Sequence, residues 1–131
     1  MCMIDCDYDR VTVLHKRMQR AIKPHRCMEC GRQIDSGETY LCERYVFDGS
    51  ASTHKTCEHC IVAREWLTDE CGGFIYGSVE EDLREHAYEG YPMDVRRVAV
   101  GMAWQWRTPR GKLMPIPRAP LTTHERMKPH H

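Results

Sequence analysis

Two C-x-x-C pairs, Cys27/Cys30 and Cys57/Cys60, are the residues of this chain that could do metal chemistry. A C-x-x-C turn places two sulfur atoms on one side of an ion, and zinc prefers four such ligands in a tetrahedron. Gly31 eases the turn of the first pair. The second pair lies at the expected start of a helix, whose positive end favours thiolates. We therefore predict one structural Zn²⁺ bound by these four cysteines.

A second ligand set is also open at this stage. His54 and Cys57 form an H-x-x-C pattern, so Cys27, Cys30, His54 and Cys57 would resemble the finger of poly(ADP-ribose) polymerases. A LIM-like arrangement would add a second ion at Cys60, but only Cys71 follows as a further cysteine. The four-cysteine set is the preferred prediction, and His54 is the alternative ligand.

Catalytic chemistry has little support in the sequence. A site closed by four cysteines has no open position at which to activate water. The H-x-E and P-C-x-x-C signature of zinc deaminases is absent, as are a Walker loop and a dinucleotide fingerprint. His54, on a strand before a helix, keeps an HNH-like nuclease open, although the chain contains no Asn. We expect no catalytic residue and no enzymatic activity.

The elements that position the cysteines follow from turn signals and periodicity. Residues 25–71 read as a cysteine knuckle, a strand over 39–47, an Asp48-Gly49 hairpin turn, a returning strand over 51–56 and a helix over about 57–71. Glycines 72 and 73 end that helix. A knuckle, a hairpin and a helix make the layout of a treble-clef zinc finger. The expected fold class is α+β, with a zinc-bound treble-clef-like core and additional flanking helices.

Three flanking helices are expected. Residues 10–23 have apolar side chains at helical spacing, Val11, Leu14, Met18 and Ile22, and Pro24 would end this helix. Its other face carries basic side chains that are either solvated or bind phosphate: Arg10, Lys16, Arg17, Arg20 and Lys23.

The other two helices are expected over residues 78–89 and 94–106. Ser78 and Glu81 form a capping box for the first, and Trp106 belongs to the inner face of the second. After residue 107, further regular helix is excluded by Pro109, Pro115, Pro117 and Pro120. The chain is therefore predicted to be one zinc-binding domain over residues 1–106, followed by an extended or mobile basic, Pro-rich tail over 107–131.

The composition is that of a globular protein of 131 residues, with 29% charged residues and a formal net charge of zero. No apolar run reaches the roughly 20 residues of a membrane span. The first residues, MCMIDCDYDR, have neither a basic nor an apolar leader region, so we expect no signal peptide and a cytoplasmic location. In a reducing cytosol, clustered cysteines favour metal binding over disulfides.

Charge is unevenly distributed along the chain. Residues 61–95 carry two Lys/Arg against nine Asp/Glu, whereas residues 96–131 carry eight against one. The basic tail could attract an anionic partner or fold back on the acidic segment. The candidate partner-binding residues are Arg107, Arg110, Lys112 and Arg118 in the tail, and Glu80, Glu81 and Glu85 in the acidic helix.

Four segments carry a resemblance to small zinc-finger-like proteins encoded by tailed phages and prophages, most of them uncharacterised. These segments are KPHRCMECGRQIDSGETY, FDGSASTHKTCEHCIVAREWL, ECGGFIYGSVEEDLREH and VGMAWQWRTPRGKLMPIP. They span about Lys23 to Pro117. The resemblance implies an accessory protein of the bacterial host cytoplasm and carries the ligand role to Cys27, Cys30, Cys57 and Cys60. It attaches no activity.

The leading functional prediction is a non-enzymatic phage or prophage accessory protein. Its zinc supports the fold, and its surface binds a host or phage macromolecule, with a protein as the preferred partner and inhibition of a host or defence system as one such role. The first alternative is a nucleic-acid-binding zinc-finger protein, which the zero net charge disfavours. The second alternative is the HNH-like nuclease.

Overall fold

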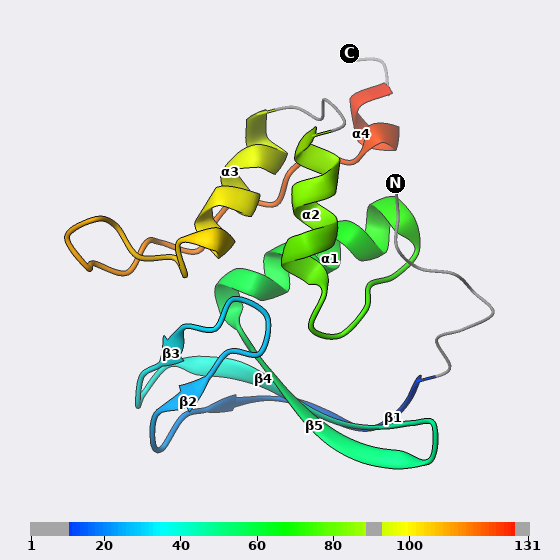
Figure 1. The fold of residues 1–131 in the computed structure, drawn as a ribbon, viewed down its shortest axis with the longest axis vertical. Coiled ribbons are helices and arrows are strands. Elements are labelled where there is room, and N and C mark those ends of the chain that lie inside the picture. The colour runs from blue at the N-terminus through cyan, green and yellow to red at the C-terminus, as the bar shows by residue number, and fades with distance from the viewer. Residues whose placement is uncertain (1–10, 89–92, 128–131) are drawn as a thin grey trace.

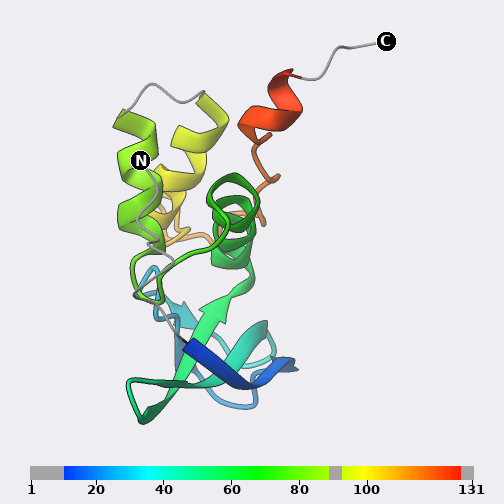
Figure 2. The ribbon, with the colours of Figure 1, turned by 90° about the vertical axis from the view of Figure 1, so that its right-hand side faces the viewer.

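The computed structural model describes residues 11–88 and 93–127. Its elements are β1 (Val11–Arg20), β2 (His25–Arg26), β3 (Gln33–Ile34), β4 (Thr39–Phe47), β5 (Ser50–Cys57), α1 (Glu58–Cys71), α2 (Val79–Tyr88), α3 (Met93–Ala103) and α4 (Thr123–Met127). Figures 1 and 2 show a strand layer with the helices on one side of it. The expected α+β class is confirmed.

The main sheet has three antiparallel strands in the order β1-β4-β5. β4 and β5 form the expected hairpin, and both turn residues, Asp48 and Gly49, have positive φ angles of 51° and 78°. Such angles match the twist of the two strands, which explains the Asp-Gly pair at this place. The short strands β2 and β3 form a separate two-stranded sheet that frames the first cysteine pair.

The helix predicted over residues 10–23 is wrong. Residues 11–20 form β1, which pairs with the whole of β4 from Val11↔Phe47 to Arg20↔Thr39. β4 is the central strand, and its pairing with β1 gives hydrogen-bond partners to backbone N–H and C=O groups that would otherwise have none. A β-bulge between Val13 and His15 inserts one extra residue. The bulge breaks the two-residue alternation by which a strand is recognised, so the apolar positions matched helical spacing instead.

The hydrophobic core lies between the sheet and the helices. α1 continues directly from β5, and its buried residues include Ala63, Trp66 and Leu67. α2 and α3 were expected over 78–89 and 94–106; within the described residues they span Val79–Tyr88 and Met93–Ala103. The remaining buried apolar side chains of the helices are Val79, Leu83, Val95, Val98, Ala99 and Met102.

α3 ends earlier than predicted because the chain reverses at Gln105 and Trp106, which have positive φ angles of 54° and 56°. The Trp106 amide donates to the Gly101 carbonyl at 2.8 Å, as in a Schellman-type helix end. The reversal folds the indole back onto α3, where it is only 3% exposed. A Cβ atom at Gly101 would collide with the Trp106 ring carbons Cζ3 and Cε3. Glycine is therefore required at position 101 despite its cost in a helix.

The segment after residue 107 is not the extended or mobile tail that we expected; the part described, up to residue 127, packs on the helices. Arg107 and Leu113 form an isolated β-bridge, and Thr108 to Gly111 close the turn between them. Further on, the Trp66 indole N–H donates to the Leu121 carbonyl at 3.2 Å. Arg126 of α4 contacts the Asp94 carboxylate at 2.6 Å. The expectation that prolines exclude any further helix is also wrong, because Thr123–Met127 form the short helix α4 after Pro120. The prolines do not prevent tertiary contacts either.

No helix among residues 11–88 and 93–127 has the length and the apolar character that a membrane span requires.

A first prediction concerns the contact between Gly101 and Trp106. Gly101→Ala should lower the free energy of unfolding by about 1–3 kcal/mol, because the indole must move out of its site. Helix propensity alone would give the opposite sign, a gain of about 1 kcal/mol. Chemical denaturation of the zinc-loaded protein measures the change, with Val100→Ala at the exposed neighbouring position as the control. A stabilised Gly101→Ala protein would contradict the packing described.

Candidate metal centre

The four predicted cysteines converge on one point. Their sulfur atoms all lie within 4.8 Å of one another, and the Sγ atoms of Cys30 and Cys57 are 4.0 Å apart. Four sulfurs bound to zinc at about 2.3 Å in a tetrahedron would be about 3.8 Å apart. Only a small contraction therefore separates the observed cluster from a zinc site. The four-cysteine arrangement was predictable from the two C-x-x-C pairs alone.

Three different parts of the fold bring these sulfurs together. Cys27 and Cys30 lie in the turn between β2 and β3, Cys57 is the last residue of β5, and Cys60 lies in the first turn of α1. The turn closes through a hydrogen bond from the Gly31 amide to the Cys27 carbonyl at 2.9 Å, and Gly31 has a positive φ of 81°. Non-glycine residues rarely adopt this conformation, which explains the glycine after the first pair.

Main-chain contacts hold the cysteine turn against the hairpin. The Met28 amide donates to the Lys55 carbonyl at 2.8 Å, and the Cys57 amide donates to the Cys27 sulfur at 3.4 Å. Cys27, Cys57 and Cys60 are fully buried, whereas Cys30 is partly exposed. The turn and the helix start are therefore joined by backbone hydrogen bonds as well as by the sulfur cluster.

The four thiols alter one another's acidity. The pKa of Cys27 falls to about 7, first because the Cys30 thiol can donate to its thiolate. The pKa of Cys57 is also lowered, most by the Cys27 thiol. The pKa values of Cys30 and Cys60 are raised, again most by Cys27. The lowered pKa values of Cys27 and Cys57 favour their thiolate forms, which are the forms that bind a metal.

Hydrogen-bond donors and a cation surround the sulfurs. The Trp106 indole N–H donates to the Cys60 sulfur at 3.4 Å. Arg32, only 2% exposed, lies beside Cys57, and Cys57 and Glu38 raise the pKa of its guanidinium against the opposing effect of burial. A tetrahedral zinc with four thiolates has a net charge of −2, so these groups compensate charge that the interior would otherwise disfavour.

His59, between the two cysteines of the second pair, is buried. It is 4% exposed. Its Nε2 lies 2.6 Å from the Met114 carbonyl, and its Nδ1 lies 3.4 Å from Arg32 Nη2. Since Arg32 can only donate, His59 is a neutral ring that accepts at Nδ1 and donates at Nε2. His59 thereby fixes Arg32 and ties the segment after α3 to the metal centre.

His54, the alternative ligand, lies outside the sulfur cluster. Its Nε2 is 2.7 Å from the Glu29 carboxylate, and both side chains are almost fully buried. The cluster of potential ligands found within the described residues contains the four cysteines and excludes His54. The geometry therefore favours the four-cysteine set.

Glu29 has a second role that sequence analysis missed. Its carboxylate accepts from the amides of Gly77 at 3.0 Å and Val79 at 3.3 Å, at the start of α2. An acidic group at this place satisfies free amides and favours the positive end of the helix. The predicted capping box of Ser78 and Glu81 concerns other amides, and the Ser78 amide donates to the Ile75 carbonyl at 3.0 Å. Glu29 is 50 positions before Val79 and reaches its amide because the cysteine turn packs against the helix start.

A buried ion pair, Glu43 with Arg64, joins the sheet to α1. Arg64 Nη2 donates to Glu43 Oε2 at 3.1 Å, and the Tyr76 hydroxyl donates to the same oxygen at 2.9 Å. Burial acts to raise the pKa of Glu43, but the Arg64 hydrogen bonds and charge outweigh it and the pKa is lowered. The pair is enclosed, with Phe74 and Tyr76 over the guanidinium. It is an element of the fold rather than an accessible reaction centre.

The predicted basic partner residues do not form one isolated patch. Arg107 contacts Asp35 Oδ2 at 3.5 Å, while Arg110 and Lys112 are exposed on the turn between Arg107 and Leu113. Arg118 is exposed in the segment between Leu113 and α4. This segment runs from the turn back toward α4 (Figure 1).

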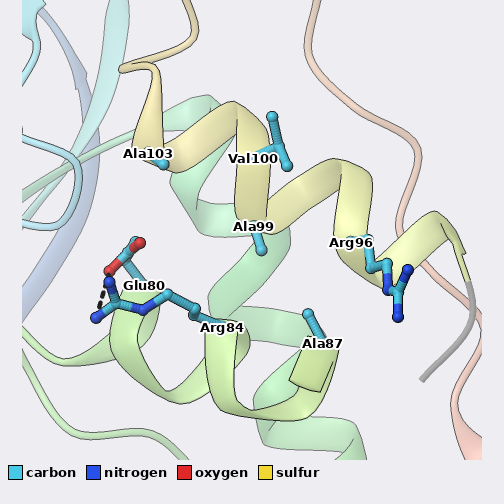
Figure 3. A pocket seen from close by; sticks show the side chains of 7 residues that line it. All are labelled: Glu80, Arg84, Ala87, Arg96, Ala99, Val100 and Ala103. Atoms are coloured by element: carbon cyan, nitrogen blue, oxygen red, sulfur yellow. Dashed lines mark ion pairs between the residues drawn. The ribbon is translucent and has the colours of Figure 1, made fainter. Parts of the chain in front are cut away.

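The predicted acidic surface of α2 is partly neutralised. Glu80 forms an ion pair with Arg84 at 3.7 Å, while Glu81 and Glu85 are exposed. Glu80 and Arg84 line a groove of about 380 Å³ between α2 and α3 (Figure 3). Arg96 of α3 also lines this groove, so two basic side chains and one acidic side chain contribute to its lining. The other lining residues are Ala87, Ala99, Val100 and Ala103.

Comparisons with protein-family models, with curated proteins and with solved structures gave no match. The functional argument therefore depends on the geometry of the site and on the residues around it.

The ligand set can be tested by substitution. Cys57→Ser should abolish zinc binding and unfold the domain, because it removes a ligand shared by both candidate sets. His54→Ala should keep close to one zinc per chain, and Cys42→Ser, which removes a cysteine outside the cluster, is the matched control. Metal analysis and circular dichroism give the result. Zinc retained by Cys60→Ser but lost from His54→Ala would establish the rival set.

The role of Arg32 gives a separate prediction. Arg32→Gln should weaken zinc binding by about 10- to 100-fold, because a buried charge beside the thiolates is lost. Competition with a chromogenic chelator measures this affinity. Arg110→Gln is the control, since Arg110 is exposed on the turn between Arg107 and Leu113. Equal affinities for the two variants would mean that Arg32 does not compensate the charge of the metal centre.

Proposed function

We propose that this protein is a non-enzymatic binding module whose fold is held by one structural Zn²⁺ on Cys27, Cys30, Cys57 and Cys60. The observation that carries the proposal is the convergence of four sulfurs within 4.8 Å. Thiolate sets of this kind select zinc or iron–sulfur clusters, and a single tetrahedral set that encloses one point fits zinc. In this proposal the cysteine turn, the β4–β5 hairpin and α1 form a treble-clef-like finger.

A structural role follows from the chemistry of the ligand set. Four cysteines fill the tetrahedron, so no position is left for a water or a substrate. The ion would instead fasten the turn between β2 and β3 to the junction of β5 and α1. Structural zinc sites contribute on the order of 10 kcal/mol to folding in small domains. That contribution is large for a chain of 131 residues.

The nuclease alternative loses support from the environment of His54. A histidine that activates water must have a ring nitrogen that is accessible to the attacking water. His54 is 2% exposed, and its Nε2 is bonded to Glu29. Tyr76 also packs against the imidazole, with the ring centroids 4.8 Å apart. This histidine is better suited to holding the cysteine turn against β5.

The biological setting proposed here is that of a phage or prophage accessory protein in the cytoplasm of a bacterial host, where it binds a host or phage macromolecule. Its support is the resemblance carried by the four segments described above. A module without an open metal position would act through its surface, and a host protein or a nucleic acid would be its target.

The proposal is tested by metal analysis of the purified full chain. We expect close to one zinc per chain, loss of secondary structure on chelation, and recovery when zinc is added back, because binding and folding are coupled. Circular dichroism follows the structure and mass spectrometry follows the metal. A metal-free protein that keeps its fold and thermal stability would refute a structural zinc.

A further inference from the structure

The face of the main sheet that points away from the helices carries a concentration of positive charge. The Glu43–Arg64 contact marks the inner face, toward α1. The residues of β1, β4 and β5 that alternate with Glu43 and its cross-strand partners form the opposite face, which we call the outer face. Its members from β1, β4 and β5 are Thr12, His15, Arg17, Gln19, Tyr40, Cys42, Arg44, Val46, Ala51, Thr53, Lys55 and Cys57. Tyr40 and Cys57 are buried at the end where His25 of β2 packs on Tyr40. No helix lies over this face among the described residues (Figure 2).

Three permanent cations lie close together there. Arg17 and Lys55 are the cross-strand partners of Cys42 from opposite sides, and Arg44 follows two residues later on β4. Neighbouring strands are about 4.8 Å apart and alternate residues of a strand about 6.8 Å apart. Arg17 and Arg44 are exposed, and Lys55 is partly exposed beside His25, with its Nζ 3.0 Å from Nδ1.

No carboxylate neutralises these cations from within the same strands. Glu43 is the one acidic residue of β1, β4 and β5, and it is buried on the inner face. By contrast, residues 58–88, which form α1, α2 and their connection, carry eight Asp/Glu against two Lys/Arg. Residues 93–127, which form α3, α4 and their connection, carry seven Lys/Arg against two Asp/Glu. The helical layer is therefore close to neutral as a whole, and the exposed cations of the outer face attract an anionic partner to this face.

The type of side chain on the outer face favours duplex over single-stranded nucleic acid. Proteins that bind single strands stack bases on exposed aromatic rings. Tyr40 is the one Tyr, Trp or Phe that the outer face contains, and it is 2% exposed, with its hydroxyl bonded to Gln19 at 2.6 Å. Exposed cations without exposed aromatic rings suit the phosphate backbone of a duplex, because contacts to phosphate do not depend on the base sequence.

We infer that the outer face binds the phosphate backbone of duplex DNA through Arg17, Arg44 and Lys55. This inference names the partner within the proposed function and rests on the zinc-stabilised fold that it assumes. The expected helix over residues 10–23 had placed Arg17 on a basic helix face. The strand conformation of β1 moves Arg17 next to Arg44 and Lys55 instead.

Binding to a mixed-sequence DNA duplex tests the inference. The zinc-loaded wild type should bind with an affinity that falls steeply between about 50 and 200 mM salt. The triple variant Arg17→Gln, Arg44→Gln, Lys55→Gln should lose about tenfold or more in affinity at the lower salt. Its salt slope should fall by about one for each phosphate contact removed. Fluorescence anisotropy with labelled DNA gives both quantities.

The control variant removes three exposed cations elsewhere, Arg110→Gln, Lys112→Gln and Arg118→Gln, which lie off the sheet. It should bind within about twofold of the wild type if the outer face is the site. Loss of binding in the control with retention in the sheet variant would overturn the inference. Tighter binding of the corresponding single strand than of the duplex, or no binding of wild type to the duplex at low salt, would also overturn it.

Cys42 gives an independent measurement at the centre of the face. Its thiol is free, partly exposed and placed between Arg17 and Lys55. Bound duplex should slow its alkylation by a maleimide, which peptide mass spectrometry follows at this one site. Equal rates with saturating duplex and without it would contradict contact with the outer face. Zinc content and circular dichroism of each variant are measured in parallel, so failure of the metal centre is distinguished from failure of DNA binding.

Discussion

The structure depends on bringing four sulfur atoms from three separate places in the fold to one point. Cys27 and Cys30 come from a short turn, Cys57 from a strand end and Cys60 from a helix start. Four thiolates at this spacing would repel one another and would be costly to bury, so a bound cation and nearby donors would stabilise them. Once the turn is fixed against the β5–α1 junction, Glu29 reaches the start of α2 and Trp106 reaches Cys60.

The groups around the sulfurs show how far this constraint extends. Arg32 contacts His59, and His59 contacts the Met114 carbonyl, so the segment after α3 is joined to the centre through two side chains. Gly101 allows a second link between the segment after α3 and the centre, because only glycine leaves room for the Trp106 ring. The C-terminal segment therefore belongs to the folded unit, although its prolines suggested a separate tail.

Paired, buried charges and exposed cations lie on opposite faces of the main sheet. The interior contains polar pairs that are closed on themselves, His54 with Glu29 and Glu43 with Arg64. These pairs fix the sheet beneath the helices and leave no accessible nucleophile or base among them. The exposed cations of β1, β4 and β5 lie on the opposite side of the sheet, where they can meet a partner. The proposed partner surface and the cysteine cluster therefore lie in separate parts of the same small domain.

The sequence by itself determined what local spacing encodes: the two C-x-x-C pairs, the Asp48-Gly49 hairpin and the helix that ends before Gly72. Cysteine pairs and tight turns depend on neighbouring residues, so they can be read without the rest of the chain. Tertiary structure decided the rest. Residues 11–20 form a strand because they pair with an edge of β4. A bulge interrupts their alternation of inward and outward side chains. The second ligand set was set aside because His54 lies against Glu29, a contact across 25 positions that no local pattern records.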